Sequence, residues 1–479
     1  MINGLNLVNR TNSEVYQATS GISHAEPSQA NSNQSASVSS KTLSNLSGPT
    51  FTQAVRLKTS LTTAEEQKKF SEISKNLSNS NRKKLNVLLK NGRLLSSDSN
   101  DKSTTLDNLH KIITEKRANG LDSKGILGDV VVALENPYSI TQKFGDVPTP
   151  IANQILNNQN LYATRVASPS NYLDALKTSG KLPNLQPITK QLLDVVSSCC
   201  VAASIQFNIA HKNPAEYARM AEGLSSQHAS VRKNINLADI TPDEDTAKFL
   251  LKQFKVPFYQ VKDGVVEVTM SPDKNALVRA QIQSTPAYKD SGERSPVDVL
   301  MQSTFMNVGS QHTYNALTDI RTGTLNNDDR GLTDVEKTLA EVVSEGKNKI
   351  HVGYQQLDDT GKIVGYECPH ERTLMHIKNA LALGENVIVG YTHTDADNRV
   401  INGHEITIVG VERDKKGNEV FVCNDTDDFK DASVRYDVKY LLPKIHHAGL
   451  PVAALKDDPQ LVSSWFDSLT EYKNSQLVA

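Results

Sequence analysis

Residues 386–425 carry the clearest structural signal in the sequence and read NVIVGYTHTDADNRVINGHEITIVGVERDKKGNEVFVCND. Three segments rich in β-branched and aromatic residues, 386–393, 404–412 and 419–424, alternate with polar links that favour turns. This pattern is typical of successive strands joined by short connections. Because helical patterns precede these strands along the chain, the sequence predicts an α+β fold with an antiparallel sheet.

The residues just before this stretch predict two helices and a hairpin. Thr333 and Glu336 have the spacing of a capping box at the start of an amphipathic helix. Residues 349–356 and 362–366 flank an Asp-Asp-Thr-Gly link, which indicates a hairpin. A further helix is expected over residues 371–383, where a glycine follows the last apolar position.

Composition limits the classes of function. The chain has 479 residues, enough for two or three domains, and its 52 basic and 54 acidic residues give a net charge of −2. A balance this close to neutral argues against a nucleic-acid-binding surface. Four cysteines exclude a disulfide scaffold and indicate a reducing compartment.

Neither a membrane span nor a secretory signal is expected. The longest apolar stretch, residues 192–210, is interrupted by polar side chains, whereas a span needs about 20 predominantly apolar residues. Residues 1–10 lack a basic cluster followed by an apolar segment. We therefore expect a protein without a membrane span whose export, if any, uses a signal that is not cleaved.

The chain divides into three parts. Half of residues 1–50 are Ser, Thr, Asn or Gln, so this segment is expected to be a disordered leader. In residues 51–160, Thr62-Thr63 followed by Glu65 and Glu66 indicates a capping box, and apolar positions recur at helical spacing. This part is predicted to be a small helical module for targeting or partner binding. Residues 161–479 mix helical and strand patterns and contain the candidate chemistry.

The first candidate residue is a cysteine at the start of a predicted helix. Residues 197–204 read Ser-Ser-Cys-Cys-Val-Ala-Ala-Ser and introduce an apolar segment. The two serines are good N-cap residues, which would place a cysteine in the first turn. Unpaired N–H groups and the helix dipole stabilise a thiolate there, the form that attacks carbonyl carbons. The alternative is an ordinary buried core cysteine.

The second candidate is His404, which is expected to begin a strand directly after a turn containing Gly403. The next strand ends in Asn424-Asp425, and antiparallel pairing would bring that end close to the start of the histidine strand. An amide or carboxylate in this place can hold the second imidazole nitrogen. Taken singly, His404 could equally be a half-buried structural histidine and the Asn-Asp pair a turn.

Together these segments resemble the papain-like cysteine peptidases. Cys200-Val-Ala-Ala-Ser204 is similar to the family's Cys-x-Ala-x-Ser helix start, and residues 404–410 match its His-x-x-x-x-x-Gly strand. An Asn or Asp follows at the end of the next strand, in the family's order. The resemblance implies a papain-like fold for residues 161–479, cysteine protease activity and no cofactor.

Two choices remain within this set. Cys200 is preferred to Cys199 as the nucleophile because the residues after it fit the family pattern. Asp425 is preferred to Asn424 because a carboxylate stabilises an imidazolium better than an amide does. The resemblance thus assigns a Cys200-His404-Asp425 triad.

Among papain-like proteins, the cysteine proteases that bacteria inject through type III secretion resemble this chain most, because they share the Ser/Asn-rich leader. This likeness implies a virulence effector that acts on host proteins in the host cytoplasm, with a secretion chaperone bound near the N-terminus. The same triad supports deamidation, transglutamination or acyl transfer. A host-protein-binding effector without catalysis, on the same scaffold, is the other alternative.

Two features depart from the family pattern. The family's oxyanion-stabilising Gln stands six residues before the nucleophile, where this chain has Asp194. Gln191 and Gln186 are nearby but do not have the expected spacing. The separation of 204 residues between Cys200 and His404 is long and implies an insertion over residues 238–331, with a strand pair over 258–270 and a helix over 297–308.

Metal binding is the competing use of the histidines and cysteines. The potential ligands are Cys368, His370, His376, His393 and His404. No Cys-x-x-Cys spacing accompanies them, so solvent-facing histidines at a helix start are expected instead of a zinc site. His446-His447 is interpreted as a surface pair in a loop. No nucleotide-binding glycine motif is present in the sequence, and we expect neither metal nor cofactor.

Overall fold

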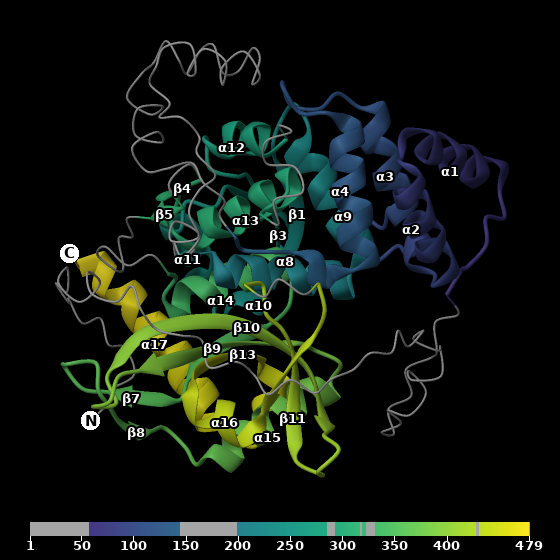
Figure 1. Ribbon diagram of the computed structural model, residues 1–479. Helices are drawn as coiled ribbons and strands as arrows, with labels where there is room; N and C mark the ends of the chain where they lie inside the picture. Colours follow the sequence, from purple (N-terminus) through teal and green to yellow (C-terminus); the bar gives the residue numbers. More distant parts are fainter. Residues whose placement is uncertain are drawn as a thin grey trace, which may run out of the picture.

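The computed structural model describes residues 57–143, 199–284, 293–316, 319–321, 331–427 and 431–478. These residues form an α+β fold in which most helices lie on one side and the largest sheet on the other (Figure 1). The predicted fold class is therefore confirmed at the level of α+β with antiparallel sheets. The predicted disordered leader, residues 1–50, lies outside the described residues.

Two groups of helices build the helical half. The first group consists of α1 (Ala64–Asn76), α2 (Asn79–Lys90), α3 (Thr105–Thr114) and α4 (Ser123–Glu135), with the short 3-10 helices η1 (Arg93–Leu95) and η2 (Pro137–Ser139). The second consists of α8 (Cys200–Lys212), α9 (Pro214–Ser225), α10 (Leu237–Ile240), α11 (Glu244–Gln253), α12 (Ala276–Gln283), α13 (Pro296–Gly309) and α14 (Asp334–Glu345). Both α1 and α14 begin with the capping boxes that the sequence predicts, at Thr63 and Thr333.

The six-stranded sheet forms the other half. Its strands are β6 (Lys349–Gly353), β9 (Val387–Thr394), β10 (Val400–Arg413), β11 (Glu419–Asn424), β12 (Val434–Asp437) and β13 (Ile445–Pro451). They lie in the order β12-β11-β10-β9-β13-β6, and every neighbouring pair is antiparallel. The three strands predicted from residues 386–425 are thus β9, β10 and β11, side by side in the centre of the sheet.

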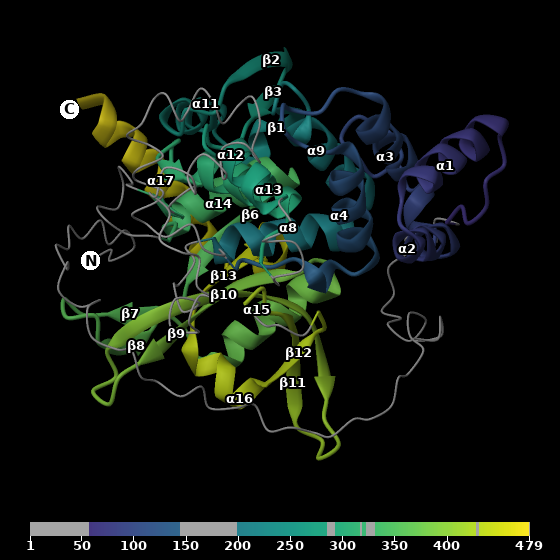
Figure 2. The same ribbon diagram turned by 45° about the horizontal axis from the view of Figure 1, so that its top comes forward.

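Helices cover both faces of this sheet. α8 and α14 contact it from the helical half, while α15 (His370–Ala382), α16 (Val438–Leu441) and the 3-10 helices η4 (Leu442–Lys444) and η5 (Val452–Leu455) pack on the opposite face (Figures 1 and 2). Double coverage explains why β9 and β11 are buried almost throughout instead of at alternate positions. α17 (Pro459–Val478) spans both halves, because Trp465 and Phe466 pack against both hydrophobic cores.

The remaining strands form small sheets: β1 (Val231–Asn236) with β3 (Val265–Met270) and β2 (Phe258–Lys262), β4 (Tyr314–Asn315) with β5 (Ile320–Arg321), and β7 (Gln355–Leu357) with β8 (Ile363–Tyr366). The β7–β8 hairpin lies at the predicted link, but the first predicted arm, residues 349–356, is wrong as a single strand: it divides into β6, which joins the six-stranded sheet, and β7. The strand pair expected over residues 258–270 is present but not isolated, since β1 extends it to three strands.

The helical half has one continuous core. Side chains of α1–α4 share it with those of α8, α9, α13 and α14, including Leu109, Val130, Ile205 and Phe305. The helix expected over residues 297–308 is α13, whose described side chains are all buried except the proline at its start. The helices of the predicted module, α1–α4, and the helix of the predicted insertion, α13, therefore pack in one core with α8. The predicted domain boundaries stay a prediction. In the described part of the chain, no helix is long and apolar enough to cross a membrane.

Candidate functional site

The start of α8 lies against β10, at the boundary between the helical half and the sheet (Figures 1 and 2). This contact brings Cys200 next to His404, although 204 residues separate them along the chain. The end of β11 lies beside β10, with Thr407 opposite Asn424. The three residues predicted from the sequence, Cys200, His404 and Asp425, therefore meet at one place.

Cys200 is the first residue of α8, and its side chain is half-buried. The N-cap residue is Cys199, which makes no side-chain cap, so the predicted serine cap is not the local arrangement; Ser197 and Ser198 lie outside the described residues. The N–H groups of the first helical turn lack intrahelical acceptors and point toward the helix start. Cys200 thus combines access to solvent with a site that stabilises negative charge.

Cys199 is held in a different environment, fully buried on the helical side. Its sulfur lies 3.1 Å from Asp319 Oδ1 and 3.2 Å from the Tyr314 hydroxyl, so the single S–H can donate to either oxygen. Asp319 is itself paired with Arg294 at 3.1 Å. Burial raises the pKa of Cys199 well above that of an ordinary thiol, so this residue stays protonated. The geometry therefore favours Cys200 over Cys199 as the candidate nucleophile.

His404 lies inside β10, not at its start. The strand begins at Val400, and Gly403 pairs with Thr392 instead of forming a turn, which corrects the predicted local structure. The His404 side chain is 13% exposed and packs edge-on against the Tyr391 ring at 5.7 Å. His404 is paired with Tyr391 on β9, so the imidazole is held by a rigid element.

Asp425 follows the last residue of β11 and binds His404. Its Oδ1 accepts a hydrogen bond from His404 Nε2 at 2.8 Å, and its Oδ2 accepts one from the Tyr436 hydroxyl at 2.8 Å. The backbone N–H of Asp427 donates to Oδ1 at 3.0 Å. Asn424 is buried, and its amide nitrogen has no hydrogen-bond partner within the part of the chain that the structure describes. Of the two alternatives, Asp425 is the one that contacts the histidine.

The electrostatics of this cluster favour a charged histidine. Burial by itself lowers the pKa of His404, but the charge and hydrogen bond of Asp425, together with a hydrogen bond from Cys200, raise it well above its usual value. Burial likewise raises the pKa of Asp425, yet His404 outweighs it and brings that pKa down to about 2. Because Asp425 occupies Nε2, the nitrogen that remains for the thiol is Nδ1.

Two contributors to the site were not predicted. Tyr436, on β12, fixes the outer oxygen of Asp425, and no pattern around it in the sequence marks this role. Lys337, on α14, is paired with Glu405 at 2.9 Å, and the charge of Cys200 is among the influences that raise its pKa. No pattern in the sequence around Lys337 marks it for this place.

The arrangement can activate a thiol. Cys200 can lose its proton to His404, Asp425 stabilises the resulting imidazolium, and Tyr436 holds Asp425 in place. The residues considered for the oxyanion position, Asp194, Gln191 and Gln186, lie outside the described residues. The backbone N–H of Cys200 is a donor at the helix start.

In the part of the chain that the structure describes, the residues of the competing zinc hypothesis do not form a group that could hold a metal ion. His376 binds Asp458 at 2.6 Å and Tyr354 at 3.0 Å, and Cys368 lies near Thr373. His376 is buried, so the prediction that it faces solvent is wrong. The prediction of a surface loop for His446-His447 is also wrong: both residues belong to β13, and His447 is only 3% exposed.

The comparisons with known proteins add no assignment to this geometry. No family model, no curated protein and no solved structure matches the chain.

Proposed function

We propose that the chain is a papain-like cysteine peptidase that cleaves peptide or amide bonds through Cys200, His404 and Asp425. The observation that carries this proposal is the Asp425–His404 pair, with Nε2 to Oδ1 at 2.8 Å, directly beside the thiol at the start of α8. A buried carboxylate that holds one imidazole nitrogen while the other faces a half-buried thiol is the arrangement that nucleophilic thiol catalysis needs.

The reaction follows from these positions. The Cys200 thiolate forms a sulfur–carbon bond with the carbonyl carbon, and the carbonyl electron pair moves onto oxygen near the N–H of Cys200. When the oxyanion collapses, the carbon–nitrogen bond breaks and His404 gives its proton to the leaving amine. Water then attacks the thioester, His404 accepts a proton from it, and the sulfur–carbon bond breaks to release the acid.

The biological setting is a finer part of the same proposal. The Ser/Asn-rich composition of residues 1–50, the four cysteines and the protease-like triad together support a secreted bacterial effector that cleaves host proteins. A different acyl acceptor would turn the same thioester into a deamidation, transglutamination or acyl-transfer product. Peptide hydrolysis is the outcome we propose.

The test uses the full-length chain and a eukaryotic cell lysate. Wild-type protein and the variants Cys200→Ala, Cys199→Ala and Cys368→Ala are incubated with lysate, and new peptide N-termini are identified by mass spectrometry. Cys368→Ala is the matched control, because that thiol is also half-buried but lies away from His404. We expect new N-termini with the wild type, Cys199→Ala and Cys368→Ala, and none with Cys200→Ala.

Other results would overturn specific parts of this proposal. Identical cleavage by Cys200→Ala would remove Cys200 as the nucleophile. Conversion of Gln or Asn to the acid, or amine transfer without chain cleavage, would replace the peptidase by a deamidase or transferase. Capture of the same host proteins by wild type and Cys200→Ala, with no modification by either, would indicate a binding protein without catalysis.

A further inference from the structure

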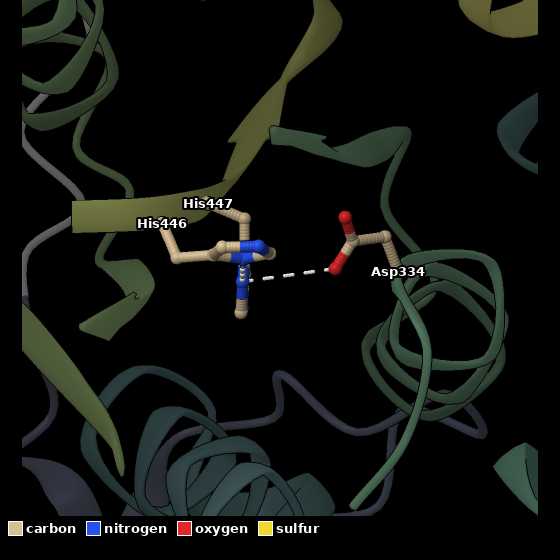
Figure 3. Close-up of side chains that lie close together, drawn as sticks. All are labelled: Asp334, His446 and His447. Carbon is tan, nitrogen blue, oxygen red and sulfur yellow. Dashed lines mark hydrogen bonds and ion pairs between the residues drawn. The ribbon is translucent and has the colours of Figure 1, made fainter. Parts of the chain in front are cut away.

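A second cluster of reactive side chains lies where β13 meets the start of α14. It consists of His446, His447 and Asp334, and Figure 3 shows all three side chains turned toward one another. Neighbouring residues of a regular strand point to opposite faces. Here the pairing of β13 with β9 is irregular between Ile445 and His447, and both rings reach the same place.

The donor atoms have the spacing of ligands around a single ion. Nδ1 of His446 lies 3.0 Å from Nδ1 of His447, and that nitrogen lies 3.6 Å from Oδ1 of Asp334. One ligand atom from each of the three residues can be chosen so that all lie within 4.8 Å of one another. Ligand atoms about 2.1 Å from a tetrahedral Zn²⁺ are roughly 3.4 Å apart, so only small side-chain movements would be needed.

The surroundings of His447 favour its use as a ligand. Its other ring nitrogen, Nε2, lies 2.9 Å from Oε1 of the buried Glu405. A histidine that binds a metal usually donates its second N–H to a carboxylate, which fixes the ring and leaves the first nitrogen unprotonated. Lys337 Nζ also lies 3.0 Å from Nε2, but an ammonium has no acceptor atom, so Glu405 is the group that can accept an N–H from Nε2. With that N–H directed to Glu405, Nδ1 of His447 faces His446 and Asp334.

The charges of the cluster leave room for a cation. Lys337 neutralises one carboxylate, with Nζ 2.9 Å from Glu405, 3.0 Å from Nε2 of His447 and 3.5 Å from Asp334. With both imidazoles neutral, two carboxylates and one ammonium give a net charge of −1.

The site is open on one side. Asp334 is 30% exposed and His446 is half-buried, whereas His447 is almost fully enclosed. Three protein ligands with a solvent-accessible fourth position are typical of zinc sites that exchange a ligand, in contrast to closed four-ligand structural sites. Two imidazoles and one carboxylate suit Zn²⁺ better than Mg²⁺ or Ca²⁺, which prefer all-oxygen ligands.

We propose that Asp334, His446 and His447 bind a divalent transition-metal ion, with Zn²⁺ as the best fit, and that Glu405 orients His447 for this purpose. The site shares no ligand with the Cys200-His404-Asp425 cluster, and its existence does not depend on the proposed peptidase activity. Lys337 interacts electrostatically with both sites, because the charges of Cys200 and Asp334 both raise its pKa.

The experiment titrates the metal-stripped full-length chain with Co²⁺, a coloured substitute for Zn²⁺, and repeats the titration calorimetrically with Zn²⁺ itself. We expect one bound ion with the visible bands of nitrogen and oxygen ligands and without a thiolate-to-cobalt charge-transfer band. His446→Ala and Asp334→Asn should each weaken binding by roughly ten-fold or more. His228→Ala is the matched control, because that ring is exposed and distant in sequence, and it should bind as the wild type does.

Several outcomes would overturn the inference. If the wild-type protein does not bind cobalt, the inference is wrong, and no variant is needed to show it. Unchanged affinity in His446→Ala or Asp334→Asn would exclude these ligands, and a charge-transfer band that disappears in Cys200→Ala would place the ion on the candidate active-site thiol. If the variants fail to fold, the proton NMR spectrum of the cobalt-loaded wild type decides, since two ligating histidines require two strongly shifted imidazole N–H signals.

Discussion

Replacing Asp425 with asparagine tests whether the buried carboxylate makes Cys200 reactive. The substitution keeps the size of the side chain but removes the charge that lies 2.8 Å from His404 Nε2. In the wild type, the imidazolium is stabilised against the cost of burial by this charge, which raises the pKa of His404. Without it, burial dominates and the histidine gives up its proton at lower pH.

The expected loss of imidazolium stabilisation can be worked out from the pKa of Asp425. Its pKa falls from 3.8 to about 2 although burial opposes the fall. At 1.36 kcal/mol per pH unit this is about 2.4 kcal/mol, or roughly a 60-fold change in an equilibrium constant. His404 is the largest of the influences that lower this pKa, ahead of the hydrogen bonds from Asp427 and Tyr436. The balance between the neutral thiol–imidazole pair and the thiolate–imidazolium pair should therefore shift by a factor of this order toward the neutral form.

The assay is the rate of alkylation of Cys200 by iodoacetamide as a function of pH, followed by mass spectrometry of the modified peptide. Asp425→Asn should slow alkylation most between about pH 5 and pH 7, by up to roughly 60-fold. The difference should disappear above about pH 8.5, where an ordinary thiol ionises without help. The direction of the change in rate follows from two facts. Asp425 is charged at every pH above about 2, and the raised pKa of His404 keeps the imidazole protonated at pH values where an ordinary histidine is neutral.

Asp427→Asn is the matched control, because this residue is exposed and reaches Asp425 only through its backbone N–H. It removes the same charge two residues away and should leave the alkylation profile unchanged. Equal rates for the wild type and Asp425→Asn at pH 6 would refute the reasoning, since the ion pair would then have no influence on the thiol. Equal slowing by both variants would indicate a general charge effect instead of the specific contact.

Two further predictions concern Tyr436 and a buried ion cluster in α9. Tyr436→Phe removes a hydrogen bond of 2.8 Å to the Asp425 carboxylate, worth about 1.5–3 kcal/mol, and should slow alkylation at pH 6 by roughly ten-fold; an unchanged rate would show that the hydroxyl does not support the pair. Glu216 is paired with Arg219 at 2.8 Å and has its pKa lowered from 4.5 to about 2, so Glu216→Gln should reduce the free energy of unfolding at pH 7 by about 3 kcal/mol in urea titrations. Because a depressed carboxylate pKa contributes stability only above its unfolded value, the difference should shrink as the pH falls from 4.5 through 2, and a constant difference would contradict this origin.

Much of the local structure could be predicted from the sequence because it depends on neighbouring residues. The capping boxes at Thr63 and Thr333 are read directly from spacing, since the cap and its partner are three residues apart. The strands over residues 386–425 follow from β-branched runs between polar turns. The candidate residues Cys200, His404 and Asp425 could also be selected from the sequence, because each lies in a short motif that resembles one of the papain-like family.

Other features needed contacts between distant parts of the chain. His404 lies within β10 because Gly403 pairs with Thr392 on β9, and no local signal separates that strand from a turn. The difference between Cys199 and Cys200 arises from the burial of Cys199, whose thiol contacts Asp319, 120 residues away. Tyr436 reaches Asp425 only because β12 lies beside β11.

The sequence by itself determined the α+β class, the strands over residues 386–425 and the positions of several helices. It also singled out the short set of residues that we propose for thiol chemistry. The tertiary structure decided which of these residues touch, which thiol is buried, and which carboxylate meets the imidazole. It also brought His446 and His447 from an expected surface loop to a buried junction with Asp334. The physical reason is that hydrogen bonds and charges act over a few ångströms, whereas the spacing of residues along the chain does not specify which distant segments the packed core will bring within that distance.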